Sequence, residues 1–576
     1  MRLTPSPTGA RSQLAEILAR SRSAFWSIAL LSTVLNVLLL AGSIYMMLVY
    51  DMVLPSRSVP TLVGLFALVT VVYAFQAVLD LLRSRMLLKV SATVDLGLSE
   101  KIHRLMGTLA RTQPGRDALQ PMRDLDTVRG FLAGSGPTAL IDLPWMFFFI
   151  AVLFILHPLL GLTVLLGGFV LIGLTVLTDR LSREPVARMS KLSVSRSLVA
   201  SATQRHAEVL RALGMEHRIA SSWTQVSSQF LAAQERMSNI TGTLGGLSKI
   251  SRLLLQSVVL TVGALLVMEG RASGGVIFAS SILSSRALAP VELAIANWRS
   301  FIGARQSWAQ LKEMLDKLGD TAAPPALPAP HQTLSVEGLA MAPPGTERVT
   351  VHGIGFRARA GQAIAVMGPS GCGKSTLARG LVGAVVPVRG TVRLDGAALD
   401  QWTSEALGPH IGYLPQNVEL LGGTVAQNIA RFQADAPAEA IVAAARLAGV
   451  HDLILRLPDG YNTQVGHDGA ALSAGQRQRI ALARALYGDP FLVVLDEPNS
   501  NLDREGEEAL AAAVEATAAR GAIVIVIAHR PAILSACHAV LLMQDGQIQD
   551  YGPKERVLPE LFPRPADPPV RLVPKV

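Results

Sequence analysis

The sequence is poor in cysteine, in aromatic residues and in charge. Its 576 residues include two cysteines, Cys372 and Cys537, which argues against a disulfide framework and suits a reducing cytoplasm. Aromatic residues make up 5% and charged residues 16% of the chain, whereas 50% of it is hydrophobic. This balance, with a mean hydropathy of +0.38, is too apolar for a wholly soluble protein. The length allows several domains, so a membrane part and a soluble part are indicated.

The formal net charge of +9 raises the question of a nucleic-acid partner. The basic residues, however, lie mostly between apolar runs and form no continuous basic segment. That distribution is typical of membrane topology, in which cytoplasmic loops are rich in Lys and Arg. We therefore expect contact with a lipid bilayer and no nucleic acid.

Six apolar runs before Trp298 are long enough for membrane-spanning helices. They cover about 25–49, 59–79, 139–156, 159–178, 253–268 and 274–295. The first run is too long for the core of a signal peptide and lacks a cleavage site, so it is expected to be retained. Basic segments at 80–135 and 179–252 separate the runs and place these loops, and both termini, in the cytoplasm. Tyr50–Ser58 is then a tight external turn.

Composition also suggests the domain boundaries. The chain divides into a cytoplasmic N-terminal segment 1–23, a membrane domain 24–315, a linker 316–331, a soluble domain 332–562 and a Pro-rich tail 563–576. The long basic segments predict transmembrane helices that extend into the cytoplasm. Short coupling helices are expected at their tips, near Gln113–Thr127 and His206–Ser222.

The soluble domain contains the sequence GPSGCGKST between the apolar run Ala363–Met367 and a helical segment. Strand, glycine-rich turn and helix in this order make a phosphate-binding loop, whose backbone N–H groups cradle nucleotide phosphates. We expect Lys374 to reach the β- and γ-phosphates and the Ser375 hydroxyl to ligate Mg²⁺. A purely structural glycine turn has no need of this Lys–Ser pair. The predicted ATP-binding residues of the loop are Gly368, Pro369, Ser370, Gly371, Cys372, Gly373, Lys374, Ser375 and Thr376.

A second buried strand, Phe491–Leu495, delivers two carboxylates beside the phosphates. Asp496 is expected to hold Mg²⁺. Glu497 is expected to orient or deprotonate the water that attacks the γ-phosphate. The alternative, in which the pair only caps a turn, is disfavoured because a phosphate loop precedes it.

A third segment, Leu472–Gln476, runs into a helix. Ser473 and Gly475 lie at the helix start, where a hydroxyl, backbone donors and the helix dipole suit a γ-phosphate. The segment resembles the signature sequence of ABC transporters, which usually has a glycine at the position of Ala474.

Further motifs of that family occur in the expected order. Gln416 resembles the Q-loop glutamine, Asp503 ends a D-loop-like segment, and His529 resembles the switch histidine. The fold class implied is an all-α six-helix transmembrane domain of the ABC exporter type, followed by an α/β P-loop ABC ATPase domain. Its cofactors would be ATP and Mg²⁺.

The resemblance also implies a homodimer that sandwiches two ATP molecules. Each would lie between the phosphate loop of one subunit and the signature residues Ser473, Ala474, Gly475 and Gln476 of the other. Glu497 and His529 would be catalytic, with His529 contacting the γ-phosphate. Gln416 would contact Mg²⁺ together with Ser375 and Asp496, and Gln416 and Asp503 would complete the nucleotide site.

Two segments depart from the exporter pattern. An aromatic residue that stacks on adenine is expected near Leu339–Gly345, which has none. Exporters commonly carry a glutamate where this chain has His467, followed by Asp468. Adenine stacking and the contact with the coupling helices are therefore in question.

Four segments resemble type I protein secretion transporters, especially the PrtD group. They are Tyr45–Leu62, Asp142–Trp145, Arg286–Pro290 and Asp496–Asp503. The group implies an inner-membrane ATPase that works with a periplasmic membrane fusion (adaptor) protein and a TolC-like outer-membrane duct. Its cargo would be unfolded proteins with uncleaved C-terminal signals, such as repeat-in-toxin proteases, lipases or adhesins. The sequence has no room for the N-terminal peptidase of other type I exporters, so we expect no leader processing.

Two ionisable residues in the spans, Asp142 and Arg286, are costly in lipid and should face protein or water. One hypothesis is that they approach each other and line the polypeptide path. The alternative is a structural ion pair or snorkelling to the interface.

Two other functions remain open at this stage. The first is a lipid or drug exporter on the same scaffold, and the second is an ATP-gated regulator that transports nothing. The presence of Glu497 and His529 counts against the regulator. The six spans exclude a soluble ABC ATPase of DNA repair.

Overall fold

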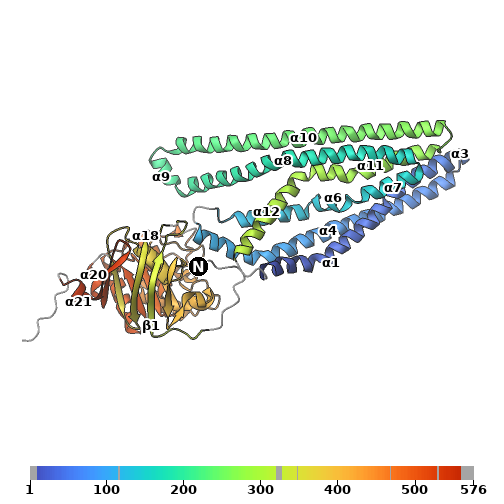
Figure 1. The fold of residues 1–576 in the computed structure, drawn as a ribbon. Helices are drawn as coiled ribbons and strands as arrows, with labels where there is room; N and C mark the ends of the chain where they lie inside the picture. Colours follow the sequence, from blue (N-terminus) through green and yellow to red (C-terminus); the bar gives the residue numbers. More distant parts are fainter. Residues whose placement is uncertain are drawn as a thin grey trace, which may run out of the picture. The chain divides into compact units, whose positions relative to one another are not determined.

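The computed structural model describes residues 9–113, 117–318, 327–346, 348–466, 469–528 and 531–559. They form two compact units, a helical one whose last described residue is Leu318 and a mixed α/β one described from Leu327 (Figure 1). This division follows the sequence, because long apolar runs occupy the first part and short β-branched runs the second. The expected fold class is confirmed.

The helical unit is built from elements that run nearly end to end. They are α1 (Gly9–Leu38), α2 (Leu40–Leu48), a π-helical turn (Val49–Val53), α3 (Leu54–Ser56), α4 (Val59–Thr112), α5 (Gln120–Ala133), α6 (Gly136–Asp142), α7 (Trp145–Leu156), α8 (Pro158–Arg205), α9 (Ala207–Ala212), α10 (Glu216–Met268), α11 (Gly274–Ala296) and α12 (Trp298–Leu318). Among the described residues, 6 helical segments are long and apolar enough to cross a membrane. Their exact membrane boundaries stay a prediction.

Three helices are much longer than a bilayer requires. The helices α4, α8 and α10 contain 54, 48 and 53 residues. At about 1.5 Å per residue each spans roughly 70–80 Å, more than twice the ~30 Å hydrocarbon core. Helices α8 and α10 lie side by side, with α9 joining their far ends (Figure 1). The expected extension of the transmembrane helices, with a short helix at this tip, is therefore present.

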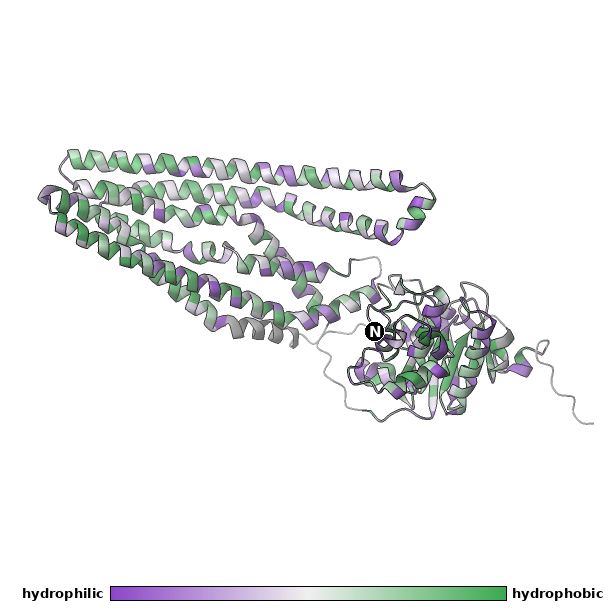
Figure 2. Ribbon diagram, turned by 180° about the vertical axis from the view of Figure 1, so that it is seen from behind, coloured by the Kyte–Doolittle hydropathy of each residue, from purple (hydrophilic) through white to green (hydrophobic). Residues whose placement is uncertain are grey.

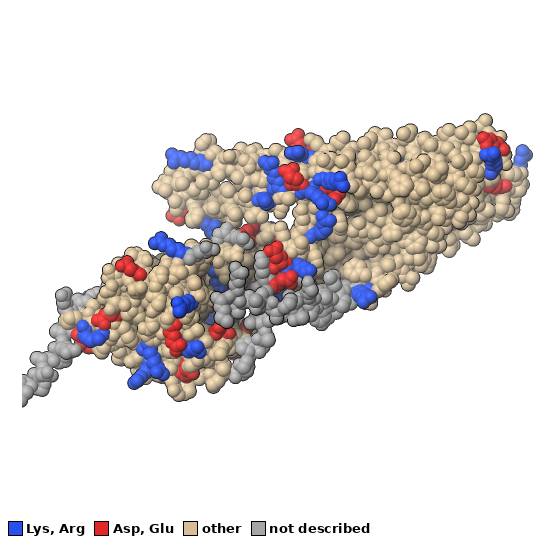
Figure 3. Space-filling model, in the orientation of Figure 1, with Lys and Arg blue, Asp and Glu red and all other residues tan. Residues whose placement is uncertain are grey.

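The polar residues of the helical unit gather away from the α3 end. Figure 2 shows hydrophobic residues dominating the half of the bundle nearest α3 and hydrophilic residues increasing along α8 and α10 toward α9. On the face drawn in Figure 3, a broad band of this unit carries no Lys, Arg, Asp or Glu, and charged residues lie beyond it at both ends. A band of this kind suits the hydrocarbon core of a membrane.

The expected external turn is shorter than predicted. We expected a tight external turn over Tyr50–Ser58, but the chain stays helical through Ser56 and reverses at Arg57, whose φ is 50°. The reason is tertiary, because the Asp51 carboxylate accepts hydrogen bonds from Ser273 Oγ at 2.6 Å and from Gly275 N at 2.8 Å. These contacts join the first reversal of the chain to the start of α11.

The hypothesis that Asp142 approaches Arg286 is wrong. Asp142 Oδ2 pairs with Arg83 Nη1 at 2.9 Å, and Asp142 Oδ1 accepts from Asn36 Nδ2 at 3.0 Å. Arg286 is exposed on α11. Helix α4 continues past the expected end of the second span and so brings Arg83 to Asp142, where each side chain is less than one-fifth exposed.

The α/β unit contains two sheets. The larger one has the strand order β10-β9-β3-β8-β7-β6. All of its neighbouring strands are parallel except β9 and β10, which are antiparallel. Its strands are β3 (Ala363–Met367), β6 (Ile411–Leu414), β7 (Leu492–Asp496), β8 (Ile523–Ile527), β9 (Ala539–Gln544) and β10 (Gln547–Pro553). The second sheet is antiparallel, with the order β2-β1-β4-β5. It consists of β1 (Thr333–Met341), β2 (Val351–Arg359), β4 (Arg389–Leu394) and β5 (Ala397–Ala398).

The helices of this unit are α13 (Lys374–Leu381), α14 (Ser404–Leu407), α15 (Val425–Ile429), α16 (Ala438–Leu447), α17 (His451–Leu455), α18 (Ala474–Leu486), α19 (Arg504–Ala519), α20 (Pro531–Ser535) and α21 (Lys554–Val557). Of these, α13, α18 and α19 pack against strands of the larger sheet. The strands β3, β7 and β8 are buried along almost their whole length, as continuous apolar runs predict for a central parallel sheet. Their carboxyl ends meet at one edge, which is where ligands bind in such sheets.

Part of the expected linker and all of the expected C-terminal tail lie outside the described residues. Helix α12 extends to Leu318, into the start of the linker, and the chain is described again from Leu327.

Candidate functional site

The phosphate loop follows β3 and is shaped by two close backbone approaches. Gly368 and Gly373 have φ values of 153° and 98°. A Cβ atom on Gly368 would lie 2.2 Å from the Met543 carbonyl oxygen, and one on Gly373 would lie 2.8 Å from Val351 Cγ2. Only glycine fits at these two positions without displacing a neighbouring strand. The sequence pattern at this loop therefore has a steric cause.

Lys374 begins α13 and is 6% exposed. Its Nζ donates hydrogen bonds to the carbonyl oxygens of Gly368 at 2.8 Å and Pro369 at 2.9 Å. The ammonium group is thus held inside the curl of the loop, beside the first N–H groups of a helix. Helix N-termini and a fixed positive charge together favour bound phosphate. Ser370 and Gly371 are exposed at the crest of the loop, whereas Cys372 is buried.

Asp496 and Ser375 form the oxygen-rich part of the site. Ser375 Oγ donates to Asp496 Oδ1 at 3.2 Å, and Asp496 is 1% exposed. Asp496 Oδ2 is buried without a hydrogen-bond partner. Burial raises the pKa of this carboxyl, although the Ser375 hydrogen bond acts against that shift. An unpaired carboxylate oxygen beside a hydroxyl fits Mg²⁺, which binds one or two carboxylates together with substrate phosphates.

Metal clusters of another kind are not evident in the described part of the chain. It contains no group of three or more His, Cys, Asp or Glu side chains that could hold a metal ion. A magnesium site completed by nucleotide oxygens does not need such a group.

Glu497 follows Asp496 in an unusual backbone conformation. Its φ is 50°, in the left-handed region, and its N–H donates to Ile527 O of β8 at 3.1 Å. The turn separates the two carboxylates, so that Glu497 Oε2 accepts a hydrogen bond from Gln416 Nε2 at 3.1 Å. The structure therefore brings together Gln416 and Glu497 from segments 81 residues apart. Strained left-handed residues cluster at functional sites.

The signature segment opens α18 with a capping box. Ser473 Oγ accepts from Gln476 N at 3.3 Å, and Gln476 Oε1 accepts from Ser473 N at 2.8 Å. Ser473 and Ala474 are exposed, which leaves the helix N-terminus accessible. A Cβ atom on Gly475 would lie 2.9 Å from Asn501 O, so this glycine allows the segment after Glu497 to pass close to α18.

Sequence analysis missed Gln478, which connects α18 to the Glu497 turn. Gln478 is 2% exposed, and its Nε2 donates to Pro498 O at 2.5 Å and to Glu497 O at 3.3 Å. Its Oε1 accepts from Asn501 N at 3.2 Å. In the sequence Gln478 lies between Arg477 and Arg479, so no local signal indicated its burial. Both ends of this amide fix the backbone that follows the catalytic candidate Glu497.

Comparisons with known proteins agree with this geometry. Residues 25–291 match the family model of the ABC transporter transmembrane region, and residues 351–500 match that of the ABC transporter. The chain is 52% identical to the type I secretion system ATP-binding protein PrsD of Rhizobium meliloti (strain 1021), over 96% of this chain and 95% of the relative. The chain belongs to the ABC ATP-binding proteins of type I secretion systems.

More distant secretion proteins align with most of this exporter. It is 31% identical to the cyclolysin secretion/processing ATP-binding protein CyaB of Bordetella pertussis, over 94% of this chain and 76% of the relative. It is 29% identical to the leukotoxin translocation ATP-binding protein LktB of Mannheimia haemolytica, over 93% of this chain and 76% of the relative. A solved bacterial Atm1-family ABC exporter with ATP bound has the same fold, with a TM-score of 0.81, 22% identity and coverage of 94% of this chain and 97% of that one.

These findings establish the activity of the chain. It is an ATP-driven exporter of a type I secretion system, which binds ATP and couples its hydrolysis to transport. Its six apolar helical segments and its ABC membrane region make it a multi-pass inner-membrane protein.

Asp503 caps a helix and forms an ion pair within its own chain. Its carboxylate caps α19 by accepting from Gly506 N at 2.9 Å and also pairs with Arg479 Nη2. The Gly506 hydrogen bond, followed by Arg479, lowers the pKa of Asp503. Its predicted contribution to the nucleotide site stays a prediction.

The other expectations concern the switch histidine, the segment before the signature and the adenine position. His529, His467 and Asp468 are not among the described residues. Near the expected adenine position, Leu339 and Met341 are fully buried in β1. These two side chains therefore belong to the core of the smaller sheet.

Proposed function

We propose that the exporter moves unfolded proteins with uncleaved C-terminal signals out of the cell. Repeat-in-toxin proteases, lipases and adhesins are the expected cargo. The single observation that carries this proposal is the 52% identity to PrsD over nearly the full length of both chains. Relatives named for cyclolysin secretion and leukotoxin translocation support a protein cargo over a lipid or a drug.

The working assembly is proposed to be a homodimer with partners in the cell envelope. Each phosphate loop, Gly368–Thr376, would face Ser473–Gln476 of the other subunit across a shared ATP. A periplasmic adaptor protein and a TolC-like outer-membrane duct would complete the path. Both termini would lie in the cytoplasm, because the basic segments between the spans follow the positive-inside rule.

The residues of the ATP site have distinct proposed roles. Lys374 and the N-terminus of α13 bind the phosphates, and Ser375, Asp496 and Gln416 hold Mg²⁺, which when bound neutralises charge on the phosphates. Glu497 takes the proton of the attacking water, and the Gln416 amide holds the Glu497 carboxylate in position at 3.1 Å. His529 assists at the γ-phosphate. The fit of Mg²⁺ is supported by the unpaired Asp496 Oδ2 beside the Ser375 hydroxyl.

The test of cargo class uses the exporter in lipid nanodiscs. ATP hydrolysis is measured while adding the C-terminal segment of a repeat-in-toxin protein encoded beside the exporter gene, with a scrambled segment as the control. A saturable change in rate with the native segment alone is expected. A response to lipids or small amphiphiles, with none to the segment, would replace protein export by lipid or drug export.

A further inference from the structure

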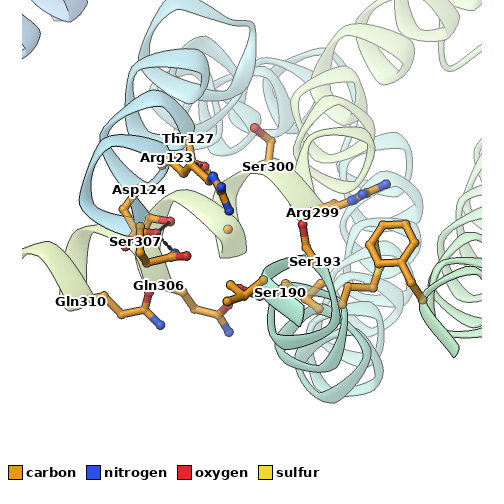
Figure 4. Close-up of a pocket in the computed structure, with 16 residues that line it drawn as sticks. Arg123, Asp124, Thr127, Ser190, Ser193, Arg299, Ser300, Gln306, Ser307 and Gln310 are labelled. Atoms are coloured by element: carbon orange, nitrogen blue, oxygen red, sulfur yellow. Dashed lines mark hydrogen bonds between the residues drawn. The ribbon is translucent and has the colours of Figure 1, made fainter. Parts of the chain in front are cut away.

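A groove in the helical unit lies between α5, α8, α10 and α12, with a volume of about 540 Å³. Figure 4 shows its polar wall, where Asp124 and Ser307 lie together at one end and Arg299 lies at the other. Val186, Met189 and Phe230 add an apolar side. A space of this size suits a side chain and its flanking backbone.

The floor of the groove carries two buried acceptors without donors. Asp124 is 3% exposed, and its Oδ1 accepts from Ser307 Oγ at 2.8 Å and from Gln120 Nε2 at 3.1 Å. Asp124 Oδ2 and Gln120 Oε1 are both buried and have no hydrogen-bond partner. Buried acceptors in this condition are costly, and a ligand that brings N–H donors removes that cost.

Among the described residues, Asp124 also has no ion-pair partner. Burial raises the pKa of Asp124, although the hydrogen bonds from Ser307 and Gln120 act against that shift. The neighbouring Arg123 pairs with Asp117, at 2.8 Å between Nη1 and Oδ2. Arg299 is exposed, and its guanidinium points away from Asp124 (Figure 4). A cation that reaches Oδ2 would therefore meet a carboxylate that has hydrogen-bond donors at Oδ1 but no ion-pair partner among the described residues.

The position of the groove restricts the occupant. Helix α5 precedes the third expected membrane span, α12 follows the sixth, and residues 186–194 of α8 lie beyond the fourth. A lipid in the bilayer does not reach this level. A water-borne chain that combines N–H donors, a positive charge and an alkyl stem matches both the acidic floor and the apolar side.

We propose that this groove binds a lysine or arginine side chain of the exported polypeptide, with Asp124 Oδ2 and Gln120 Oε1 accepting its N–H groups. The inference rests on the proposed function only in taking the cargo to be an unfolded polypeptide. Asp124 is a binding residue here and has no part in ATP hydrolysis.

The first test measures peptide binding to the full exporter in nanodiscs. The probe is a fluorescent nonapeptide of glycine and serine with one central arginine, and its control carries citrulline, which has the same shape without the charge. We expect the arginine peptide to bind about ten-fold more tightly or better. In Asp124→Asn, which keeps the shape of the side chain and the contact with Ser307, this preference for the arginine peptide should disappear. Equal binding of both peptides to the unaltered exporter would overturn the proposal.

Gly303 provides a second test that leaves every charge in place. It lines the groove, and a Cβ atom there would have Thr127 Cγ2 at 3.7 Å as its nearest neighbour, an ordinary contact. Gly303→Ala should therefore fold and bind as before, whereas Gly303→Met should fill the groove and lose arginine-peptide binding at least about ten-fold. Unchanged binding in Gly303→Met would contradict the proposal.

The ATPase and peptide-binding measurements together separate this inference from the cargo proposal. If the cargo signal fails to stimulate the unaltered exporter while the arginine preference is present, the cargo proposal fails and the groove assignment stands. If the signal stimulates but arginine and citrulline peptides bind alike, the groove assignment alone fails.

Discussion

Replacing Glu497 by glutamine should stop ATP hydrolysis and leave ATP binding intact. Glutamine has the same shape, and its amide oxygen is able to accept the hydrogen bond that Gln416 Nε2 donates to Oε2 at 3.1 Å. The backbone N–H bond to Ile527 O is also kept. The left-handed φ of 50° costs both residues alike, so the fold should be unaffected. What is lost is the ability to take a proton.

The expected size of the effect follows from that loss. General bases contribute about 10²–10⁴ in rate, which corresponds to roughly 3–5 kcal/mol of transition-state stabilisation. We expect kcat of Glu497→Gln to fall by about this factor. The dissociation constant of ATP should change by less than about three-fold, because the phosphate contacts of Lys374 and α13 are untouched.

Two measurements on the purified exporter test this expectation. Phosphate release gives kcat, and titration with a fluorescent ATP analogue gives binding. Glu419→Gln is the matched control, since Glu419 is exposed and lies three residues beyond Gln416 in the sequence. A fall in kcat of less than about ten-fold in Glu497→Gln would remove Glu497 from its proposed role. A loss of ATP binding would mean that the substitution acts on the fold of the site.

Three other regions give predictions of different kinds. Gln478→Ala removes a buried amide that holds the Glu497 turn, so we expect a several-fold fall in kcat with ATP binding retained and about 1–3 kcal/mol lower stability; an unchanged kcat would refute the positioning role. Arg83→Met and Asp142→Asn should each destabilise the helical unit, by up to about 3–5 kcal/mol for Arg83→Met. In thermal denaturation the double variant should lose less stability than the sum of the two single variants, and additive losses would contradict a coupled pair. Burial raises the pKa of Cys537 to about 12, so at pH 8 the thiolate is scarce; maleimide should label it only after denaturation and faster as the pH rises, and rapid labelling of the native exporter would show that the thiol is accessible.

Local sequence patterns were sufficient for the elements that carry the ATP site. A buried apolar run, the glycine pattern and the Lys–Ser pair predicted a strand, a loop and a helix, which are β3, Gly368–Gly373 and α13. A second apolar run predicted the strand that brings Asp496 to Ser375. These predictions succeed because the carboxyl ends of parallel strands meet at one edge, so chain order alone limits which side chains come together.

Contacts chosen by helix packing could not be predicted in the same way. Sequence analysis paired Asp142 with Arg286 because both lie within apolar runs, whereas Arg83 lies just beyond the expected end of the second span. In the structure α4 continues as helix through that position, and the long Arg83 side chain reaches Asp142. The contact of Asp51 with Ser273 and Gly275 has the same origin, since it depends on where α11 begins relative to the first reversal.

The buried amide of Gln478 connects the signature segment at the start of α18 to the turn that carries Glu497. Ser473 caps the N-terminus of α18, and Gln478 lies little more than one turn further along the same helix, with its amide fixed to the backbone after Glu497. In the proposed homodimer, Ser473 faces the ATP held by the other subunit, while Glu497 serves the ATP held by its own. In that dimer, a displacement of α18 by the nucleotide at one site would be transmitted to the glutamate at the other site, because three hydrogen bonds between the Gln478 amide and the backbone resist independent movement. Gln478→Ala should therefore weaken the dependence of hydrolysis at one site on ATP at the other, seen as a loss of sigmoidal ATP dependence where the unaltered exporter has one.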